Sequence, residues 1–319
     1  MTAASTDTSR LYPLPLALAT YLGWSGYRKG SLSRTGALTA SAVGYATMAN
    51  PFPGYGVLLI TFYLAGSRAT KYKSAIKASL ETHASSREQS KASNSLSSRA
   101  RDTSSGNRSA TQVLCNSLIS ALAALAYRVS NANNALADPL SSRAGSAGIS
   151  NRFLTLIVLG HFAACLGDTL SSELGILSQS APRLVTQPWR VVPKGTNGGV
   201  SAWGTLVAGI GGAGIGAILC ASLSFFSRPL QAPVTTTLVA LGTAAGLMGS
   251  LIDSVLGAVL QQTLYDPNTG KVLVGSTAPG SAAKWTKITG YNVLDNNAVN
   301  FVASSATAFL TAWVGSRLL

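Results

Sequence analysis

Four of the ten carboxylates in this 319-residue chain lie inside or at the edge of apolar stretches. These four are Asp168, Glu173, Asp253 and Asp295. A charge at the centre of a bilayer costs about 2.5–3.5 kcal/mol on insertion scales, so such acids usually face a protein interior or a water-filled pocket. A single acid of this kind can be a structural carboxylate bound by neighbouring hydroxyls or amides. Four of them together indicate a polar site.

The first two acids lie in residues 167–175, which read GDTLSSELG. On a helix, Asp168 shares a face with Ser171 and Ser172, at spacings of three and four residues. Glu173 points well away from Asp168 on the same helix. The two acids can therefore bind one ion only if the helix breaks at one of the flanking glycines. Otherwise they have different partners.

A glycine-rich segment, PKGTNGGVS, directly precedes a long apolar helix. Its candidate phosphate-binding residues are Lys194, Gly195, Thr196, Asn197, Gly198 and Gly199. Glycine-rich backbone can present several N–H groups to one anion, and a helix start adds the positive end of its dipole. The segment is not a Walker A motif, because its lysine precedes the glycines and does not open the helix. A turn followed by a helix cap is the alternative interpretation.

Two later segments add polar residues to apolar stretches. Asp253 and Gln261 lie on one helical stripe of small and polar residues, which needs partners inside a bundle. The sequence LDNNAVN places Asp295 and Asn296 at a helix entrance, where either residue could simply cap the helix. Asn300 lies one turn inside that helix, so capping explains it less easily.

These residues together suit phosphate and metal chemistry. Mg²⁺ typically takes one or two carboxylates and completes its shell with water and substrate phosphates. The predicted metal ligands are Asp168, Glu173 and Asp253. Phosphoryl transfer needs mainly positioning and charge neutralisation, so no histidine or cysteine nucleophile is required. The chain has only two histidines, which excludes a multi-histidine metal centre. Its three cysteines form no CxxC pair and do not indicate a disulfide framework.

The elements that must hold these residues are membrane helices. The chain is 47% hydrophobic and 11% charged, whereas soluble domains are about one quarter charged. A crossing helix needs roughly 20 mostly apolar residues. Eight stretches are candidates, at 11–27, 35–50, 54–67, 111–128, 153–178, 199–226, 234–262 and 297–319. We expect an all-α polytopic membrane bundle of about 6–8 transmembrane helices, forming one integral-membrane domain over residues 1–319.

The basic residues fall mainly on one side of this predicted bundle. Loops 28–34, 68–110, 183–194 and 271–287 share one side and hold 18 of the 24 Lys and Arg residues, which predicts that this side is cytosolic. Residues 79–110 are rich in Ser, Arg and Lys and are predicted to be a disordered cytosolic insert. The net charge of +14 does not indicate nucleic-acid binding, because it is spread between apolar stretches.

The segments GDTLSSELG, VPKGTNGGVS, GSLIDSVLGAVLQ and LDNNAVN, in that order, closely resemble those of the transmembrane protein 19 family, also called domain of unknown function 92. The resemblance runs from about residue 11 to the C-terminus. The family includes a plant plastid phytyl-phosphate kinase of vitamin E synthesis and is similar in pattern to membrane CTP-dependent polyprenol kinases. The resemblance implies that Asp168, Ser172 and Glu173 contact a metal or nucleotide and that residues 194–199 bind phosphates.

The sequence therefore predicts an isoprenyl-phosphate kinase, in which a nucleoside triphosphate, CTP with Mg²⁺, phosphorylates a prenyl monophosphate dissolved in the bilayer. The prenyl tail would lie among the Gly- and Ala-rich helices. The alternative is a transporter or ion-coupled carrier that uses the same acids, although no internal repeat supports it. A lipid synthase of the CDP-alcohol phosphotransferase type would need a multi-aspartate pattern that this chain lacks. The N-terminus lacks the Arg-rich character of a transit peptide, which favours the endoplasmic reticulum or endomembrane system over plastid or mitochondrion.

Overall fold

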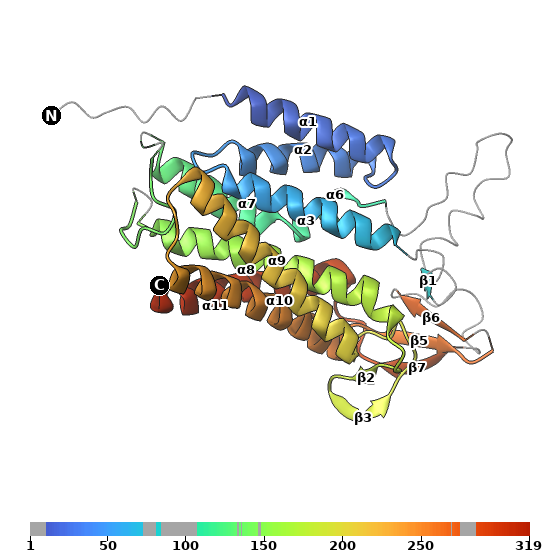
Figure 1. Cartoon of the computed structure of the whole chain (residues 1–319). Helices are drawn as coiled ribbons and strands as arrows, with labels where there is room; N and C mark the ends of the chain where they lie inside the picture. The colour runs from blue at the N-terminus through green and yellow to red at the C-terminus, as the bar shows by residue number, and fades with distance from the viewer. Residues whose placement is uncertain are drawn as a thin grey trace, which may run out of the picture.

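The computed structural model describes residues 11–72, 81–83, 107–132, 134, 136–145, 148–268, 270–274 and 285–319. In this part of the chain, helices lie side by side in one elongated bundle, with short strands gathered at one end (Figure 1). The first helix begins, and the last helix ends, at the opposite end. The described parts of loops 28–34, 68–110, 183–194 and 271–287 therefore share the strand-bearing end, on one side of the bundle as the charge pattern predicted.

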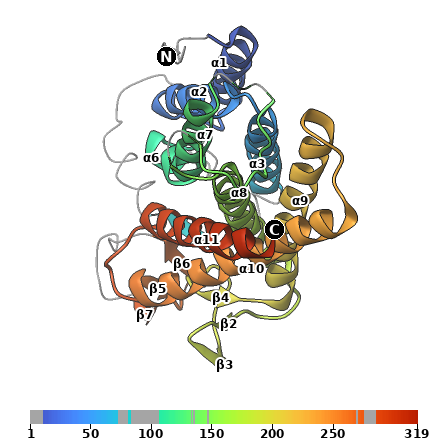
Figure 2. The ribbon, with the colours of Figure 1, turned by 90° about the vertical axis from the view of Figure 1, so that its left-hand side faces the viewer.

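A single helix, α8 (Asn151–Leu174), forms the centre of this bundle (Figure 2). Every residue from Leu154 to Gly167 is buried, because this stretch is apolar on all sides. The helices packed around it are α3 (Gly54–Lys71), α7 (Leu118–Ser130), α9 (Ala202–Phe226), α10 (Ala232–Leu260) and α11 (Asn296–Leu318). The large side chains of the common core, Tyr55, Tyr127 and Phe162 among them, lie between these helices.

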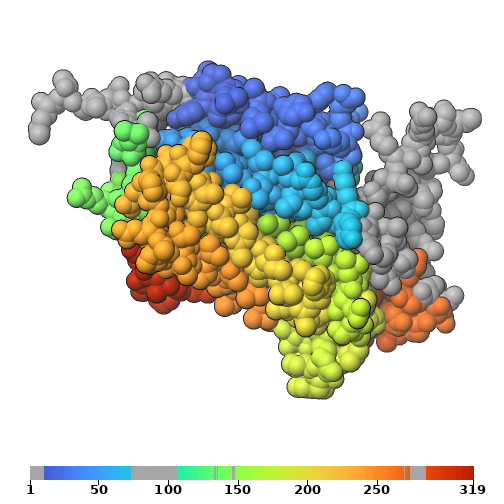
Figure 3. All heavy atoms as spheres, in the orientation of Figure 1, coloured from blue at the N-terminus to red at the C-terminus, as the bar shows by residue number. Residues whose placement is uncertain are grey.

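A second group of helices covers one side of the core. It consists of α1 (Pro13–Arg28), α2 (Arg34–Met48) and the short α6 (Ala110–Cys115). Helix α2 lies between α1 and the helices α3, α6 and α7, so α1 forms the outer edge of the molecule (Figure 3). The α2–α3 turn is held by Asn50, whose amide donates to the Ala124 carbonyl at 2.6 Å.

All eight predicted apolar stretches are helical, although the fourth is divided between α6 and α7 at Asn116 and Ser117. Four of the described helices are long and apolar enough to cross a membrane: α8 with its 3₁₀ extension to Leu177, α9, α10 and α11. The finer count of 6–8 crossings stays a prediction, because α1, α2 and α7 are shorter than a full bilayer span.

The all-α prediction is wrong at the polar end of the bundle, where two small sheets lie. One has the order β3-β2-β4, with antiparallel pairs between β2 (Arg183–Leu184), β3 (Gln187–Val191) and β4 (Gly199–Val200). The other has the order β1-β6-β5-β7. Its strands are β1 (Glu81–His83), β5 (Thr263–Asp266), β6 (Lys271–Val274) and β7 (Thr286–Thr289). Buried Leu264, Val272 and Leu273 give these short, β-branched segments a small core of their own.

The predicted disordered insert, 79–110, lies for the most part outside the described residues. Its described parts are ordered: β1 pairs in parallel with β6, and residues 107–110 lead into α6. Arg108 joins the α1–α2 connection through its backbone. Its N–H donates to the Ser31 carbonyl at 3.1 Å, and its carbonyl accepts from the Ser33 N–H at 3.0 Å. These pairings fix the point where the chain returns to the bundle.

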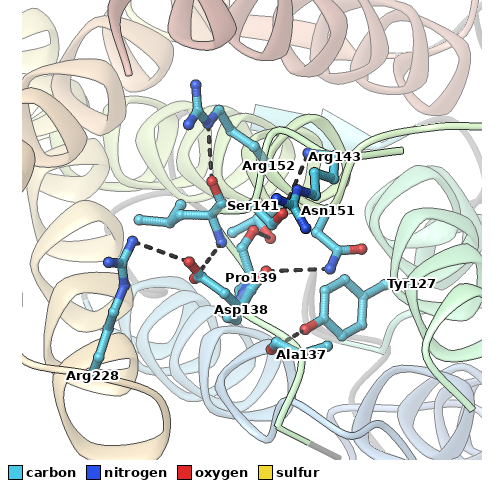
Figure 4. A network of polar contacts seen from close by, with 11 residues as sticks. Tyr127, Ala137, Asp138, Pro139, Ser141, Arg143, Asn151, Arg152 and Arg228 are labelled. Carbon is cyan, nitrogen blue, oxygen red and sulfur yellow. Dashed lines mark hydrogen bonds and ion pairs between the residues drawn. The ribbon is translucent and has the colours of Figure 1, made fainter. Parts of the chain in front are cut away.

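A polar network closes the end of the bundle that carries no strands (Figure 4). The Asp138 carboxylate pairs with Arg228 at 3.0 Å and accepts the N–H of Leu140 at 2.9 Å. Arg152 donates to the Leu140 carbonyl at 3.0 Å. The α7–α8 connection is thereby tied to α8 and to the α9–α10 turn.

Helices α9 and α10 approach each other at glycines. A Cβ at Gly212 would overlap the Gly242 carbonyl oxygen, and one at Gly246 would lie 2.5 Å from the Ala208 carbonyl oxygen. Small residues allow membrane helices to pack backbone against backbone, because no side chain separates them. The glycine run of α9 is therefore a packing surface.

We predict that Gly212→Val lowers the free energy of unfolding by about 1–3 kcal/mol, the usual cost of overpacking a well-packed interior. The melting temperature in detergent measures this effect. Gly214→Val is the matched control, because Gly214 lies on the exposed face of the same helix with open space around it. Equal losses in the two variants would contradict the α9–α10 contact.

Candidate functional site

A cavity of about 490 Å³ runs from the strand-bearing end into the helix bundle. Its size is typical of a small-molecule site. It brings together nearly all of the residues that the sequence predicted to act together. Those that line it are Asp168, Ser171, Ser172, Glu173, Lys194, Gly195, Thr196, Asn197, Gly198, Gly199, Asp253, Gln261, Asn296 and Asn300.

Asp295 is the exception among the predicted site residues. It does not line the cavity; its side chain is the N-cap of α11 and accepts the Ala298 N–H at 2.8 Å. Its exposed position explains this role, because a capping carboxylate is best hydrated at a helix start. The neighbouring Asn296 does line the cavity, so the two residues of this segment have different roles.

Asp168 and Asp253 form an acidic pair between α8 and α10. They are close enough for their charges to interact, and both border a small second cavity of about 10 Å³. Asn300 on α11 supports the pair: with its amide nitrogen turned toward the acceptors, it donates to Asp253 Oδ2 at 2.9 Å. Two neighbouring carboxylates repel each other unless a cation or a proton compensates them. The pair is therefore the part of the cavity best suited to bind a cation.

Glu173 is separated from this pair. Helix α8 continues unbroken from Asn151 to Leu174, so Glu173 and Asp168 point about 140° apart around its axis. The charge of Glu173 acts on Arg108 instead. Within the described ranges, no three His, Cys, Asp or Glu side chains are grouped to hold a metal ion. The three predicted metal ligands are thus not brought together, because the helix break that this required does not occur.

Arg108 is a cavity residue that the sequence analysis missed. Its guanidinium donates from Nη1 to Ser67 Oγ at 3.3 Å. Burial lowers the pKa of this guanidinium, while Tyr63 and Glu173 raise it, and an arginine remains charged throughout. The available signal was the capping box of Ser109 and Gln112, which fixes a helix start directly after Arg108 and so places this cation at the entrance of the fourth apolar stretch.

Lys194 lies in the connection between β3 and β4, at the edge of the cavity. Its ammonium donates to the carbonyl of Ile176 at 3.0 Å and to that of Ser178 at 2.7 Å. These carbonyls follow the end of α8, where backbone acceptors lack helical partners. An ammonium has three donors, so this arrangement leaves one N–H for a ligand in the cavity.

The glycine-rich loop uses several of its own amides internally. The Thr196 N–H and hydroxyl both donate to the Pro193 carbonyl, at 3.2 and 2.7 Å. The Gly199 N–H donates to the Thr196 carbonyl at 2.9 Å, and the Asn197 N–H donates to Thr263 Oγ1 at 3.3 Å. The turn interpretation therefore holds for these three residues, since their amides already have acceptors.

Gly195 and Gly198 are the remaining candidates for anion binding in this loop. Their φ angles are +89° and +76°, a conformation that glycine adopts without strain. In the described part of the chain, their amides donate no hydrogen bond within the protein. Gly198 also packs tightly on α10, because a Cβ there would overlap Ala258 and lie 2.7 Å from the Ser254 carbonyl oxygen.

The apolar crossing helices and the charged cavity at one end define a multi-pass integral membrane protein. The family model "Integral membrane protein DUF92" matches residues 17–308. The chain therefore belongs to the DUF92 family of integral membrane proteins, as the sequence segments indicated.

Two relatives agree with this assignment. Protein PGR of Arabidopsis thaliana is 33% identical over 315 residues, which cover 96% of this chain and 97% of the relative. An uncharacterised membrane protein of Methanocaldococcus jannaschii, MJ0933, is 41% identical over 104 residues, which cover 33% of this chain and 39% of that protein. No solved structure matches the chain.

We predict that Gly198→Ala destabilises the protein more than Gly30→Ala does. Both glycines have positive φ angles, so each alanine costs about 1–2 kcal/mol in backbone strain. Only at Gly198 does the new Cβ also meet α10, which adds about 1–3 kcal/mol. Thermal unfolding in detergent measures both variants. Similar decreases would contradict the packing of the loop on α10.

Proposed function

We propose that this protein is an isoprenyl-phosphate kinase, which transfers a phosphoryl group from a nucleoside triphosphate, CTP, to a prenyl monophosphate. The observation that carries this proposal is one continuous cavity whose lining is charged at the strand-bearing end and apolar inside the bundle. A substrate with a phosphate head and a hydrocarbon tail matches both parts. A water-soluble substrate would leave the apolar part without a ligand.

The nucleotide would bind at the charged end. The third N–H of Lys194 and the amides of Gly195 and Gly198 are available donors on one side of the cavity. Helix α9 begins at Ala202, four residues after Gly198, and its N-terminus contributes the positive end of the helix dipole. Together these groups favour a ligand that carries several phosphates.

The Asp168–Asp253 pair fits a Mg²⁺ ion, because Mg²⁺ commonly takes two carboxylates and fills its other positions with water and substrate phosphates. When bound there, Mg²⁺ supplies charge neutralisation for the transferred group. An oxygen of the prenyl phosphate attacks the γ-phosphorus, the bond from that phosphorus to the bridging oxygen breaks, and CDP leaves. The attacking phosphate is already anionic, so the protein needs to position the two substrates rather than remove a proton.

The carrier alternative is less well supported. A carrier must open its site to both sides of the membrane in turn. The cavity runs to the strand-bearing end, whereas the other end is tied by the Asp138–Arg228 network and by the buried length of α8. Chemistry at one membrane face accounts for this asymmetry without further assumptions.

We predict that Asp168→Asn lowers the rate of prenyl-diphosphate formation about 100-fold or more, since it removes charge stabilisation at the reacting phosphates. The assay uses purified protein, prenyl monophosphate, Mg²⁺ and labelled CTP or ATP. Asp295→Asn is the matched control: it makes the same chemical change at the same end of the bundle, but outside the cavity, and asparagine still caps α11.

Two results would contradict this proposal, one for the site and one for the reaction. The first is full activity of Asp168→Asn alongside wild-type protein, which would overturn the assignment of the acidic pair. The other is the absence of diphosphate product in the wild type, together with flux of a labelled solute across proteoliposomes, which would support the carrier.

We predict that Mg²⁺ raises the melting temperature of the wild type in a concentration-dependent way, as expected for a ligand of the folded state. Asp253→Asn should weaken this shift, because one of the two carboxylates loses its charge. Sodium chloride at equal ionic strength controls for screening. An equal Mg²⁺ shift in both proteins would contradict a metal site at the acidic pair.

A further inference from the structure

The cavity has an apolar arm, the inner part of the space that lies between α1, α2 and α3. Its walls are formed by small or aliphatic residues of the three helices, together with the aromatic rings of Phe62 and Tyr63. The small and aliphatic residues include Ala19, Gly23, Ala40, Gly44 and Leu59. The sequence predicted a tail among the Gly- and Ala-rich helices. In α9 and α10, the glycines are used in helix packing. The open apolar space lies on the other side of the core.

The arm is long and narrow. On α3 the lining runs from Thr70, near the charged end, to Leu59, a rise of about 16 Å along the helix. On α2 the lining runs from Ala40 to Met48, a rise of about 12 Å along that helix. Small residues face one another where α1 covers α2: a Cβ on Gly44 would lie 3.4 Å from the Ala19 Cβ. An extended hydrocarbon chain fits such a space better than a bulky ring system.

Met48 lies at the inner end of the arm. It is 7% exposed, and its side chain fills the gap between α2 and α3. A Cβ on Gly56 would lie 2.7 Å from Met48 Cγ, and one on Gly44 would lie 3.5 Å from its Cε. This nearly buried side chain lies between glycines of α2 and α3, so it sets the depth that a tail can reach.

Arg108 lies at the other end, where the apolar arm meets the charged part of the cavity. Its guanidinium is held by Ser67 of α3, and its backbone is hydrogen bonded to Ser31 and Ser33 between α1 and α2. The same helices therefore form the arm and position this cation. A guanidinium presents a planar fork of donors that matches phosphate oxygens.

We infer that the apolar arm binds the single hydrocarbon tail of a lipid monophosphate, that Arg108 binds its phosphate, and that Met48 limits the tail length. This inference rests on the proposed function and names its acceptor subsite. The acceptor phosphate then enters from the α1–α3 side, whereas the Lys194 loop and the acidic pair approach it from the α8–α10 side. The two substrates thus occupy opposite parts of one cavity.

The test measures binding without turnover. Saturated alkyl monophosphates of increasing length, from hexyl to octadecyl phosphate, are titrated against the full chain in nanodiscs without nucleotide. Each methylene that fits in the arm should raise the affinity about three- to fourfold, and the gain should stop at a limiting length. Met48→Ala should move this limit to longer chains, and Ala40→Phe should move it to shorter ones.

Matched controls separate the arm from general effects on the fold. Met248→Ala and Ala217→Phe make the same changes on the exposed face of α10 and α9, and should leave the limit unchanged. Arg108→Gln should lower the affinity for alkyl phosphates more than tenfold, with little change for alkyl alcohols of equal length. The affinity of Arg108→Lys for alkyl phosphates should lie between those of the wild type and Arg108→Gln, because lysine keeps the charge without the planar fork of donors.

The outcomes distinguish this inference from the proposed function. An equal limiting length in wild type, Met48→Ala and Ala40→Phe overturns the assignment of the arm. Tighter binding of a two-chain phosphatidate than of any alkyl phosphate overturns the single-tail subsite. Length-dependent binding that follows these variants, with no phosphoryl transfer from CTP or ATP, supports the subsite and overturns the kinase.

Discussion

The complete burial of the stretch Leu154–Gly167 of α8 is the constraint on which the rest of the structure depends. From Leu154 to Gly167 every side of this helix packs against other helices, so no charged residue can be accommodated there. Asp168 is the first residue after this buried run. The acid therefore lies where the packed core gives way to the cavity, and the position of the polar site follows from the length of the apolar run that precedes it.

The loops at the strand-bearing end hold groups that line the same cavity as Asp168. Lys194 binds the carbonyls of Ile176 and Ser178, which follow α8, and Gly198 packs against Ala258 of α10. One short loop therefore connects the segment after α8 to α10. The small sheets give this loop fixed ends, since β3 and β4 both pair with β2. Preorganised donors of this kind lose little entropy when an anion binds, which suits a site that handles several phosphates.

Local sequence patterns determined a large part of this fold. All eight apolar stretches are helical, and the described parts of the basic loops lie together at one end, because hydropathy and charge are properties of contiguous residues. The four sequence segments, taken in their order along the chain, also identified the family. All but one of the site residues predicted from them line the cavity. The sheets were missed, since strands of two to five residues carry too little periodicity to be recognised.

Only the tertiary structure decided which of these residues act together. The unbroken α8 separates Glu173 from Asp168. Helix α10 instead places Asp253 beside Asp168, and α11 places Asn300 where it donates to Asp253, although both residues lie far along the chain. Arg108 and the apolar arm likewise arise where α1, α2 and α3 meet the segment before α6. Such contacts depend on which helix faces pack, and this is set by the whole bundle. The sequence by itself therefore determined the helices, the sided charge and the inventory of polar residues, and the packing of distant helices determined the site.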